Sequence, residues 1–161
     1  MTIEGPPSSA DPAAREREAA LARHAGRLNA HPSLQYFGVR IAYPDASRVS
    51  LSLDDPPLAL RGGIGDDSVV NGGVLSALCD LAIGATAALV DPESRAATVQ
   101  LSIRLEQPLT GQRIRGEAWV DRSTRRLIFA SAELSDENGQ ICVRCQGVAT
   151  LLRGRPGAPT G

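Results

Sequence analysis

The chain has 161 residues, the length of one domain with a sizeable core rather than of two folded modules. It contains 17 Arg and no Lys against 18 Asp and Glu, and the net charge of −1 argues against nucleic acid or an anionic membrane as the main partner. Both histidines, His24 and His31, lie in the first fifth of the chain, ahead of the predicted core. This placement disfavours a Ser/His/Asp triad, a Cys/His pair or a His-rich zinc site, so we expect no metal and no cofactor.

The sequence carries no membrane or export signal. No run of about 18 uncharged apolar residues occurs. The first ten residues have neither a basic nor an apolar region of the kind a signal peptide needs, which predicts a cytoplasmic protein. Cys142 and Cys145 fall in an alternating run and would point to opposite faces of a strand, and Cys79 lies on an apolar helix. All three are therefore expected to be ordinary buried cysteines.

The two ends of the chain are predicted to be flexible. Residues 1–10 and 154–161 are rich in Gly, Pro and Ser, which leaves one domain over residues 11–153. Asp11 can cap a helix that has Pro12 at its first position, and the Ala/Arg/Glu run that follows predicts a peripheral helix over residues 11–30.

The rest of the domain has the pattern of a sheet interrupted by one helix. Two β-type runs, residues 36–43 and 48–53, flank a turn and predict a hairpin. A long loop over residues 54–70 leads to a strongly hydrophobic helix over residues 71–90. Four runs with strand periodicity or composition then predict an antiparallel meander, over residues 98–106, 112–122, 126–135 and 140–152. This order predicts an α+β domain in which an antiparallel sheet wraps around one long central helix.

The central helix presents two different surfaces at 100° per residue. Large apolar side chains share one arc that should face the sheet, namely Val74, Leu75, Leu78, Leu81, Ala85 and Leu89. Small residues share the opposing arc with one acid, namely Gly73, Ser76, Ala77, Asp80, Gly84 and Ala87. Placing a carboxylate in an apolar setting costs free energy. We therefore expect Asp80 either to pair with an Arg of a neighbouring strand or subunit or to take part in catalysis.

The start of this helix is a second candidate feature. Asn71 is a favoured N-cap, and Gly72 and Gly73 leave backbone N–H groups open in the first turn. Such groups can hold an oxyanion or a phosphate. Seven residues separate Gly73 from Asp80, or about 10.5 Å of helix rise, which one carbonyl cannot span. We therefore expect two antiparallel helices from two subunits to share each site.

Three segments together carry a resemblance to a known family, namely Asn71-Gly72-Gly73-Val74-Leu75-Ser76-Ala77-Leu78-Cys79-Asp80, Thr98-Val99-Gln100-Leu101-Ser102-Ile103 and Pro108-Leu109. They resemble the hot-dog acyl-CoA thioesterases of the phenylacetyl-CoA (PaaI-type) branch. The resemblance spans residues 36–152 and implies a hot-dog fold, an acyl-CoA substrate, and a homodimer with shared sites, usually assembled as a dimer of dimers. It implies that Asp80 is the catalytic acid, that the Gly72 amide polarises the thioester carbonyl, and that Thr98 orients the water or the acid.

Two positions depart from the pattern of that branch. Asn71 stands where the branch usually has His, and it too can cap the helix and donate a hydrogen bond. Gly65 stands about where some relatives carry an Asn that positions water, a role that could pass to Asp66, Asp67 or Ser68. These departures bear on rate and substrate, not on the fold.

Substrate contacts are expected at Gly73 and Ser76 on the small-residue arc. Arg122, Arg125 and Arg126 lie at one hairpin and could hold the phosphates of coenzyme A, although a solvated basic turn has the same composition. Two alternatives remain open. Asp80 can attack the thioester directly or activate water, and the protein can be a non-catalytic acyl-CoA binding or sensing protein. A dehydratase is disfavoured because no His follows His31.

Overall fold

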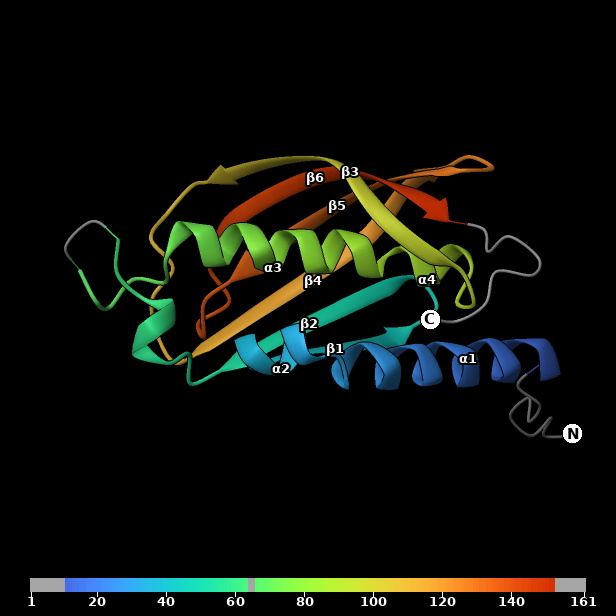
Figure 1. Ribbon diagram of the computed structural model, residues 1–161, viewed down its shortest axis with the longest axis horizontal. Coiled ribbons are helices and arrows are strands. Elements are labelled where there is room, and N and C mark those ends of the chain that lie inside the picture. Colours follow the sequence, from blue (N-terminus) through green and yellow to red (C-terminus); the bar gives the residue numbers. More distant parts are fainter. Residues whose placement is uncertain (1–10, 64–65, 153–161) are drawn as a thin grey trace, which may run out of the picture.

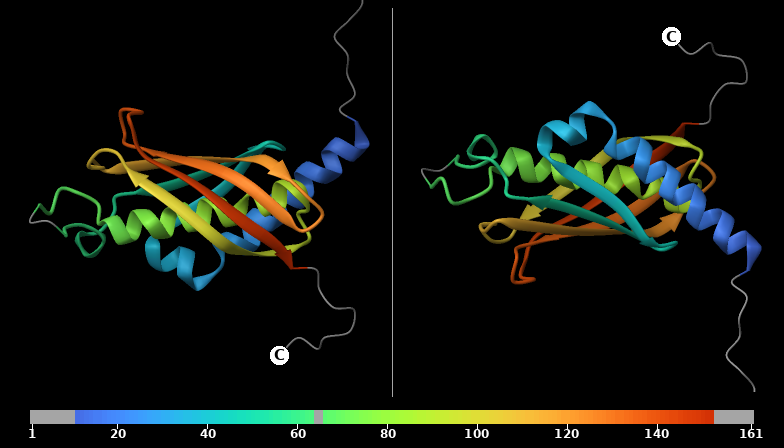
Figure 2. Two further views of the ribbon diagram at one scale, coloured as in Figure 1. Left: turned by 90° about the horizontal axis from the view of Figure 1, so that it is seen from above. Right: turned by 90° about the horizontal axis from the view of Figure 1, so that it is seen from below.

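The computed structural model describes residues 11–63 and 66–152. The two termini predicted to be flexible, and Gly65, lie outside the described residues. One antiparallel sheet of six strands curls around the helix α3, and α1 lies beside the sheet (Figures 1 and 2). The elements are α1 (Pro12–Asn29), α2 (Pro32–Phe37), β1 (Val39–Asp45), β2 (Arg48–Asp54), the 3-10 turn η1 (Leu58–Leu60), α3 (Gly72–Ala85), α4 (Ala87–Val90), β3 (Arg95–Leu105), β4 (Arg113–Ser123), β5 (Leu127–Ser135) and β6 (Ile141–Leu152).

The strand order is β1-β2-β4-β5-β6-β3, which confirms the first hairpin but corrects the predicted meander. Only β4, β5 and β6 follow one another, whereas β3 pairs with β6 at the edge of the sheet. The connection from β3 to β4 is too long for a tight hairpin. It runs past the start of α3, where Leu109 is fully buried and its carbonyl accepts a hydrogen bond of 2.9 Å from the Val70 amide. Leu109 therefore anchors the connection beside the start of α3, although the other residues of the connection are exposed or half-buried.

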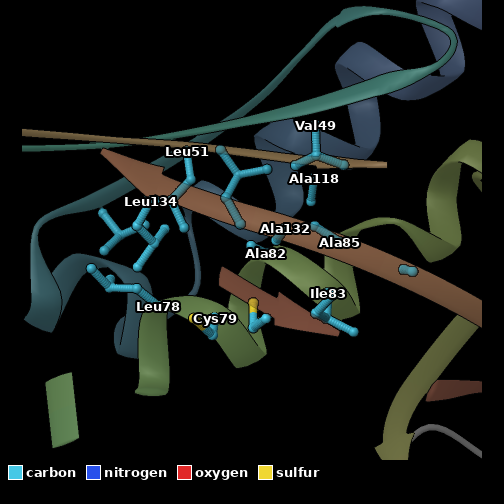
Figure 3. Packing of buried hydrophobic residues seen from close by; sticks show 14 of the residues in the cluster. Val49, Leu51, Leu78, Cys79, Ala82, Ile83, Ala85, Ala118, Ala132 and Leu134 are labelled. Carbon is cyan, nitrogen blue, oxygen red and sulfur yellow. The ribbon is translucent and has the colours of Figure 1, made fainter. Parts of the chain in front are cut away.

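The buried side of α3 packs into the concave face of the sheet. Leu78, Cys79 and Ile83 are fully buried against strand residues such as Ala132 and Leu134 (Figure 3). The predicted arcs need three corrections. The buried side of the helix also includes Cys79, Ala82 and Ile83, which the predicted sheet-facing arc omits. Two members of that arc, Val74 and Leu81, are only half-buried. One member of the small-residue arc, Ala87, is buried. A curled sheet encloses more of the helix than a flat one does, which widens the buried arc.

The central helix is also shorter than predicted. It ends at Ala85, and α4 follows after Thr86. The Thr86 hydroxyl donates a hydrogen bond of 2.6 Å to the carbonyl of Ile83 and is buried there. Such bonding of a Thr side chain to the preceding turn competes with the regular helical pattern.

Helix α2 was not predicted, and it occupies the start of the expected first strand. His31 caps it, Pro32 is its first residue, and Gly38 ends it with a φ of +72°. The strand β1 thus begins at Val39. Helix α1 is fixed to β1 by Asn29, whose side chain makes two hydrogen bonds of 2.8 Å to the backbone of Ile41.

The segment Gly72–Val90, with a mean hydropathy of 1.9, has the length and apolar composition to cross a membrane. However, 61% of this stretch is buried inside the fold, as is usual for the core helix of a water-soluble domain, so the composition is weak evidence for a membrane span.

Candidate functional site

Asn71 organises the start of α3. Its Oδ1 accepts a hydrogen bond of 2.8 Å from the Gly73 amide, which confirms the predicted N-cap. Its Nδ2 donates to the carbonyl of Gly62 at 3.0 Å, and its own amide donates to the carbonyl of Leu60 at 2.9 Å. Gly63 has a φ of +135°, and a Cβ there would lie 3.0 Å from Asn71 Nδ2. The loop before the helix is therefore shaped to fit the Asn71 side chain.

The two glycine amides at the helix start are not equivalent. The Gly73 N–H is bonded to Asn71, which corrects the expectation that both amides are open. The Gly72 N–H has no partner within the described residues. Ser76, which was expected to contact substrate, donates its hydroxyl to the Gly72 carbonyl at 2.8 Å. Gly72 is thus the one of the two that can offer a donor to a ligand.

Arg61 holds the preceding loop in place. Its guanidinium donates to the backbone carbonyls of Pro56 at 3.1 Å, Ser68 at 2.8 Å and Gly111 at 2.6 Å. Because three separate backbone segments converge on one side chain, the wall beside Gly72 is ordered by the chain itself.

A cavity of about 600 Å³ opens at this helix start. We call it the Gly72 cavity. Its lining is mainly apolar and comes from the loop before α3, the first turns of α3 and the end of β3 with the connection that follows, namely Gly62, Gly63, Asp66, Val69, Val70, Asn71, Gly72, Leu75, Leu105, Glu106, Gln107, Pro108 and Leu109.

Asp80 lies on the exposed side of α3. It makes no hydrogen bond and no ion pair with any described residue, so pairing with an Arg of its own chain finds no support in that part of the chain. Thr98 lies nearby on β3, since a Cβ added to Gly84, one turn beyond Asp80, would lie 3.7 Å from Thr98 Oγ1. A β-bulge between Thr98 and Gln100 interrupts the pairing with β6 at this point.

Asp80 and Thr98 line a second cavity, of about 670 Å³. We call it the Asp80 cavity. It lies between α1, α3 and the start of β3, and its lining residues are His24, Arg27, Leu28, His31, Leu34, Ile41, Asp80, Leu81, Gly84, Ala85, Ala87, Glu93, Ser94, Arg95, Ala96, Ala97 and Thr98.

Both histidines, which precede the predicted core in the sequence, line the Asp80 cavity together with Asp80 and Thr98. His24 Nδ1 lies 3.0 Å from the carbonyl oxygen of Pro92, and its ring meets Tyr43 edge-on at 6.0 Å. Burial is the main reason that the pKa of His24 lies below its usual value. No local pattern reveals that α1 packs beside β1 and α4 and so lines this cavity.

Arg125 and Arg126 are exposed at the turn between β4 and β5, as predicted, and line neither of the two cavities. The Arg126 carbonyl accepts a hydrogen bond of 2.8 Å from the Leu151 amide near the end of β6. Arg122, on the same hairpin, lies over the ring of Phe129 at 4.4 Å.

The described residues hold no cluster of three or more His, Cys, Asp and Glu side chains that could bind a metal ion. Asn71 and Gly72 line one cavity, whereas Asp80 and Thr98 line the other. The four predicted catalytic residues of one chain are therefore divided between two cavities, and we call these two pairs the predicted half-sites.

The sequence profile of the thioesterase superfamily matches residues 67–143. Among solved structures, a thioesterase family protein from Silicibacter pomeroyi aligns with this chain at a TM-score of 0.73 and 24% sequence identity. The alignment covers 83% of this chain and 99% of that protein. A Shewanella oneidensis protein related to the thioesterase superfamily has a TM-score of 0.73 and 20% identity, with 88% and 99% coverage. The PaaI protein from the phenylacetic acid degradation operon of E. coli has a TM-score of 0.72 and 14% identity, with 85% and 96% coverage. No protein of curated function matches the chain.

At these identities the structural likeness establishes the fold, and the profile match covers 77 of the 161 residues. The sheet wrapped around a central helix is the hot-dog fold, and residues 67–143 match the profile of the thioesterase superfamily. Its enzyme class is that of a thioester hydrolase.

Proposed function

We propose that this protein hydrolyses acyl-CoA thioesters in active sites shared between two subunits, as a member of the PaaI-type branch. The observation that carries the proposal is the separation of the two half-sites. Gly72, with its open amide, and Asp80, with its unpaired carboxylate, line different cavities of one chain. Two antiparallel copies of α3 would bring Asp80 of one subunit to the Gly72 amide of the partner subunit.

The surface needed for such a dimer is present on the chain. Strand β3 is an edge strand over Arg95–Leu105 and pairs on one side only, with β6. It exposes Val99 and Leu105, which are 60% and 54% accessible. A long edge with exposed apolar side chains is a template for pairing with another strand. A second copy of β3 would cover this edge and place the exposed sides of the two α3 helices against each other.

The chemistry then follows from the groups at hand. The Gly72 N–H and the positive end of α3 would polarise the thioester carbonyl and stabilise the oxyanion that forms there. If Asp80 acts as a base, it would take a proton from an attacking water, and the C–S bond would break as that proton passes to the departing coenzyme A thiolate. If Asp80 attacks the carbonyl carbon itself, coenzyme A would leave and water would then hydrolyse the acyl-aspartyl anhydride. Thr98 would orient the water or the carboxylate. Asn71 would fix the helix start that carries the Gly72 donor. Each step uses side-chain and backbone groups and needs no cofactor beyond the coenzyme A of the substrate.

Release of free thiol from a panel of acyl-CoA esters tests the proposal, with Asp80→Asn as the inactive control. We expect turnover of at least one ester by the wild-type protein and loss of that turnover in the variant. Binding of acyl-CoA without turnover by the wild-type protein would contradict hydrolysis and favour the binding or sensing protein instead.

The assembly and the location are further parts of the proposal. We expect a homodimer that pairs again into a dimer of dimers, and a cytoplasmic location. Native mass spectrometry measures the first, and a monomer that retains full turnover would contradict the shared site. Fractionation of cells that express the protein measures the second.

A further inference from the structure

The two cavities differ in chemical character. The walls of the Gly72 cavity are mainly apolar, and its charged lining residues, Asp66 and Glu106, are both acidic. The Asp80 cavity also has apolar lining residues, but it is more polar, with two cations, Arg27 and Arg95, two acids, Asp80 and Glu93, and His24. Arg27 pairs with Glu93 at 3.9 Å, whereas Arg95 forms no ion pair with a described acid. An acyl-CoA shows the same difference in polarity between its two halves. Its acyl group is commonly apolar, whereas its coenzyme A half carries amides and phosphates.

Two groups lie within hydrogen-bond distance of His24 Nδ1. The Pro92 carbonyl oxygen, at 3.0 Å, needs a proton on Nδ1, whereas Arg27 Nη2, at 3.4 Å, can only donate. The shorter contact favours the tautomer of the neutral ring with its proton on Nδ1. Nε2 then carries a lone pair, and it has no hydrogen-bond partner among the described residues. It is not a buried orphan either, since the described part of the chain has no buried unsatisfied side-chain nitrogen. Nε2 is therefore open to a ligand that offers an N–H or O–H group.

Arg95 belongs to a basic corner of the sheet. It pairs with Leu152 at the end of β6, and the neighbouring Leu151 amide is bonded to the Arg126 carbonyl. Two strand spacings of about 4.8 Å separate the start of β3 from this hairpin, so Arg95, Arg125 and Arg126 lie at one corner. All three are exposed, and none forms an ion pair with a described acid.

We propose that the Asp80 cavity receives the coenzyme A arm and that the Gly72 cavity of the partner subunit receives an uncharged, apolar acyl group. His24 Nε2 accepts a hydrogen bond from an amide of the pantetheine arm, and Arg95 binds the nucleotide phosphates together with Arg125 and Arg126. This assignment rests on the proposed function and extends it to α1 and to Arg95, which makes the peripheral helix a wall of the substrate site.

Calorimetric titration with coenzyme A and with pantetheine tests the first half of the assignment without any turnover. Arg95→Gln should weaken coenzyme A binding by about fivefold or more, the size of one exposed charge contact, and leave pantetheine binding unchanged. His24→Phe should weaken both ligands, whereas His24→Gln, which keeps an acceptor, should weaken them less. Arg113→Gln is the matched control, because Arg113 is exposed at the opposite end of β4. Unaltered coenzyme A binding in folded Arg95→Gln and His24→Phe variants would overturn the assignment.

Filling each cavity separately tests the second half. Val69→Trp narrows the Gly72 cavity, and we expect it to lower kcat/KM for long acyl-CoA esters more than for acetyl-CoA. Leu28→Trp narrows the Asp80 cavity and should raise KM for all coenzyme A esters alike. If instead Leu28→Trp alters the preference for acyl length and Val69→Trp does not, the assignment is reversed and the inference fails.

The acidic lining of the Gly72 cavity gives an independent test. Glu106 is already paired with Arg144 and Arg104, whereas Asp66 forms no ion pair with a described residue. Asp66 should therefore repel a second carboxylate, so succinyl-CoA should be hydrolysed about tenfold less efficiently than butyryl-CoA, and Asp66→Asn should reduce that difference. Equal efficiency with both esters would contradict the assignment. Absence of hydrolysis of every ester would instead refute the proposed function, and hydrolysis that is insensitive to all of these variants would refute only this inference.

Discussion

Asp80 is a carboxylate whose surroundings on one chain do not explain it. It is exposed on an apolar helix, it has no partner among the described residues, and it shares its cavity with Thr98. A group that serves stability would be expected to have a cation or several donors in contact with it. Its position is instead suited to contact with a group of another molecule, such as a substrate or a second subunit.

Asp80→Asn should lower kcat by about 10²–10⁴ and leave a folded oligomer, because the change removes the base or nucleophile and keeps the shape of the side chain. Thiol release measures kcat, and circular dichroism with native mass spectrometry measures folding and assembly. Glu117→Gln is the matched control, since Glu117 is an exposed carboxylate on β4 outside both cavities. Wild-type turnover in folded Asp80→Asn would remove Asp80 from the mechanism.

His24 should make the stability of the fold depend on pH. Burial first, and then Arg27, lower the pKa of His24, while the Pro92 carbonyl and Glu93 oppose that shift. Burial raises the pKa of the adjacent Tyr43, so Tyr43 stays protonated and uncharged near neutral pH. The unfolded chain thus binds the proton of His24 more readily, with a pKa of about 6.5. The His24 contribution is present above that pH and is lost as the pH falls through it.

Urea denaturation between pH 7.5 and pH 5 should show a fall in the free energy of unfolding that is smaller in His24→Gln. His31→Gln, at an exposed position of the same cavity wall, is the control. An identical pH dependence in wild type and His24→Gln would show that His24 does not carry the effect.

At the scale of elements, the periodicity of the sequence predicts correctly those helices and strands that are determined by neighbouring residues. The period of two around Leu101 and Ile103 gave β3, and the apolar run with Asn71 at its start gave α3. The sequence did not reveal that β3 pairs with β6 or that α1 lines the Asp80 cavity, because both depend on contacts between distant segments. Asp80 and the Gly72 amide could be proposed because each stands out in the local sequence of α3, whereas His24 gains a role only from contacts between distant segments.

The packing of α3 on β6 depends on a glycine. A Cβ at Gly147 would lie 2.8 Å from Ile83 Cγ2 and 3.0 Å from the carbonyl oxygen of Gln100. Gly147→Ala should therefore lower the free energy of unfolding by about 1–3 kcal/mol, the usual cost of overpacking a core. Urea denaturation measures this change.

Gly26→Ala is the matched control for that variant, since a Cβ at Gly26 meets nothing within 4 Å and the residue lies within α1. It should raise the free energy of unfolding by about 0.5–1 kcal/mol, because Ala favours the helix over Gly. Equal stability of Gly147→Ala and wild type would mean that α3 and β6 separate more easily than their contact indicates.

At the scale of the whole molecule, one face of the fold is left open. The curled sheet covers one side of α3, and α1 packs beside β1 and α4 (Figure 2). Asp80 and the β3 residues Val99 and Leu105 stay exposed. The two half-sites both border this open region. A second copy of the chain is the simplest partner that supplies the missing half of each site, because a two-fold axis completes both sites at once.

Complementation between two inactive variants tests that arrangement directly. One variant carries Asp80→Asn and the other Gly72→Pro, which removes the amide donor at the first helical position, where Pro is well tolerated. Loss of that donor should cost about 10²–10³ in rate. In a mixed dimer, one shared site receives both defects and the other receives neither, so the heterodimer should recover about half the activity of a normal dimer.

Subunit exchange must be verified by native mass spectrometry, and each homodimer must be shown to be folded and inactive beforehand. Recovery of turnover in proportion to the fraction of heterodimer would then establish that Asp80 and Gly72 act across the interface. If exchange occurs and no activity returns, Asp80 works with donors of its own chain. Because the chain places Asp80 and Gly72 in separate cavities, that outcome would require α3 or the loop before it to rearrange when substrate binds.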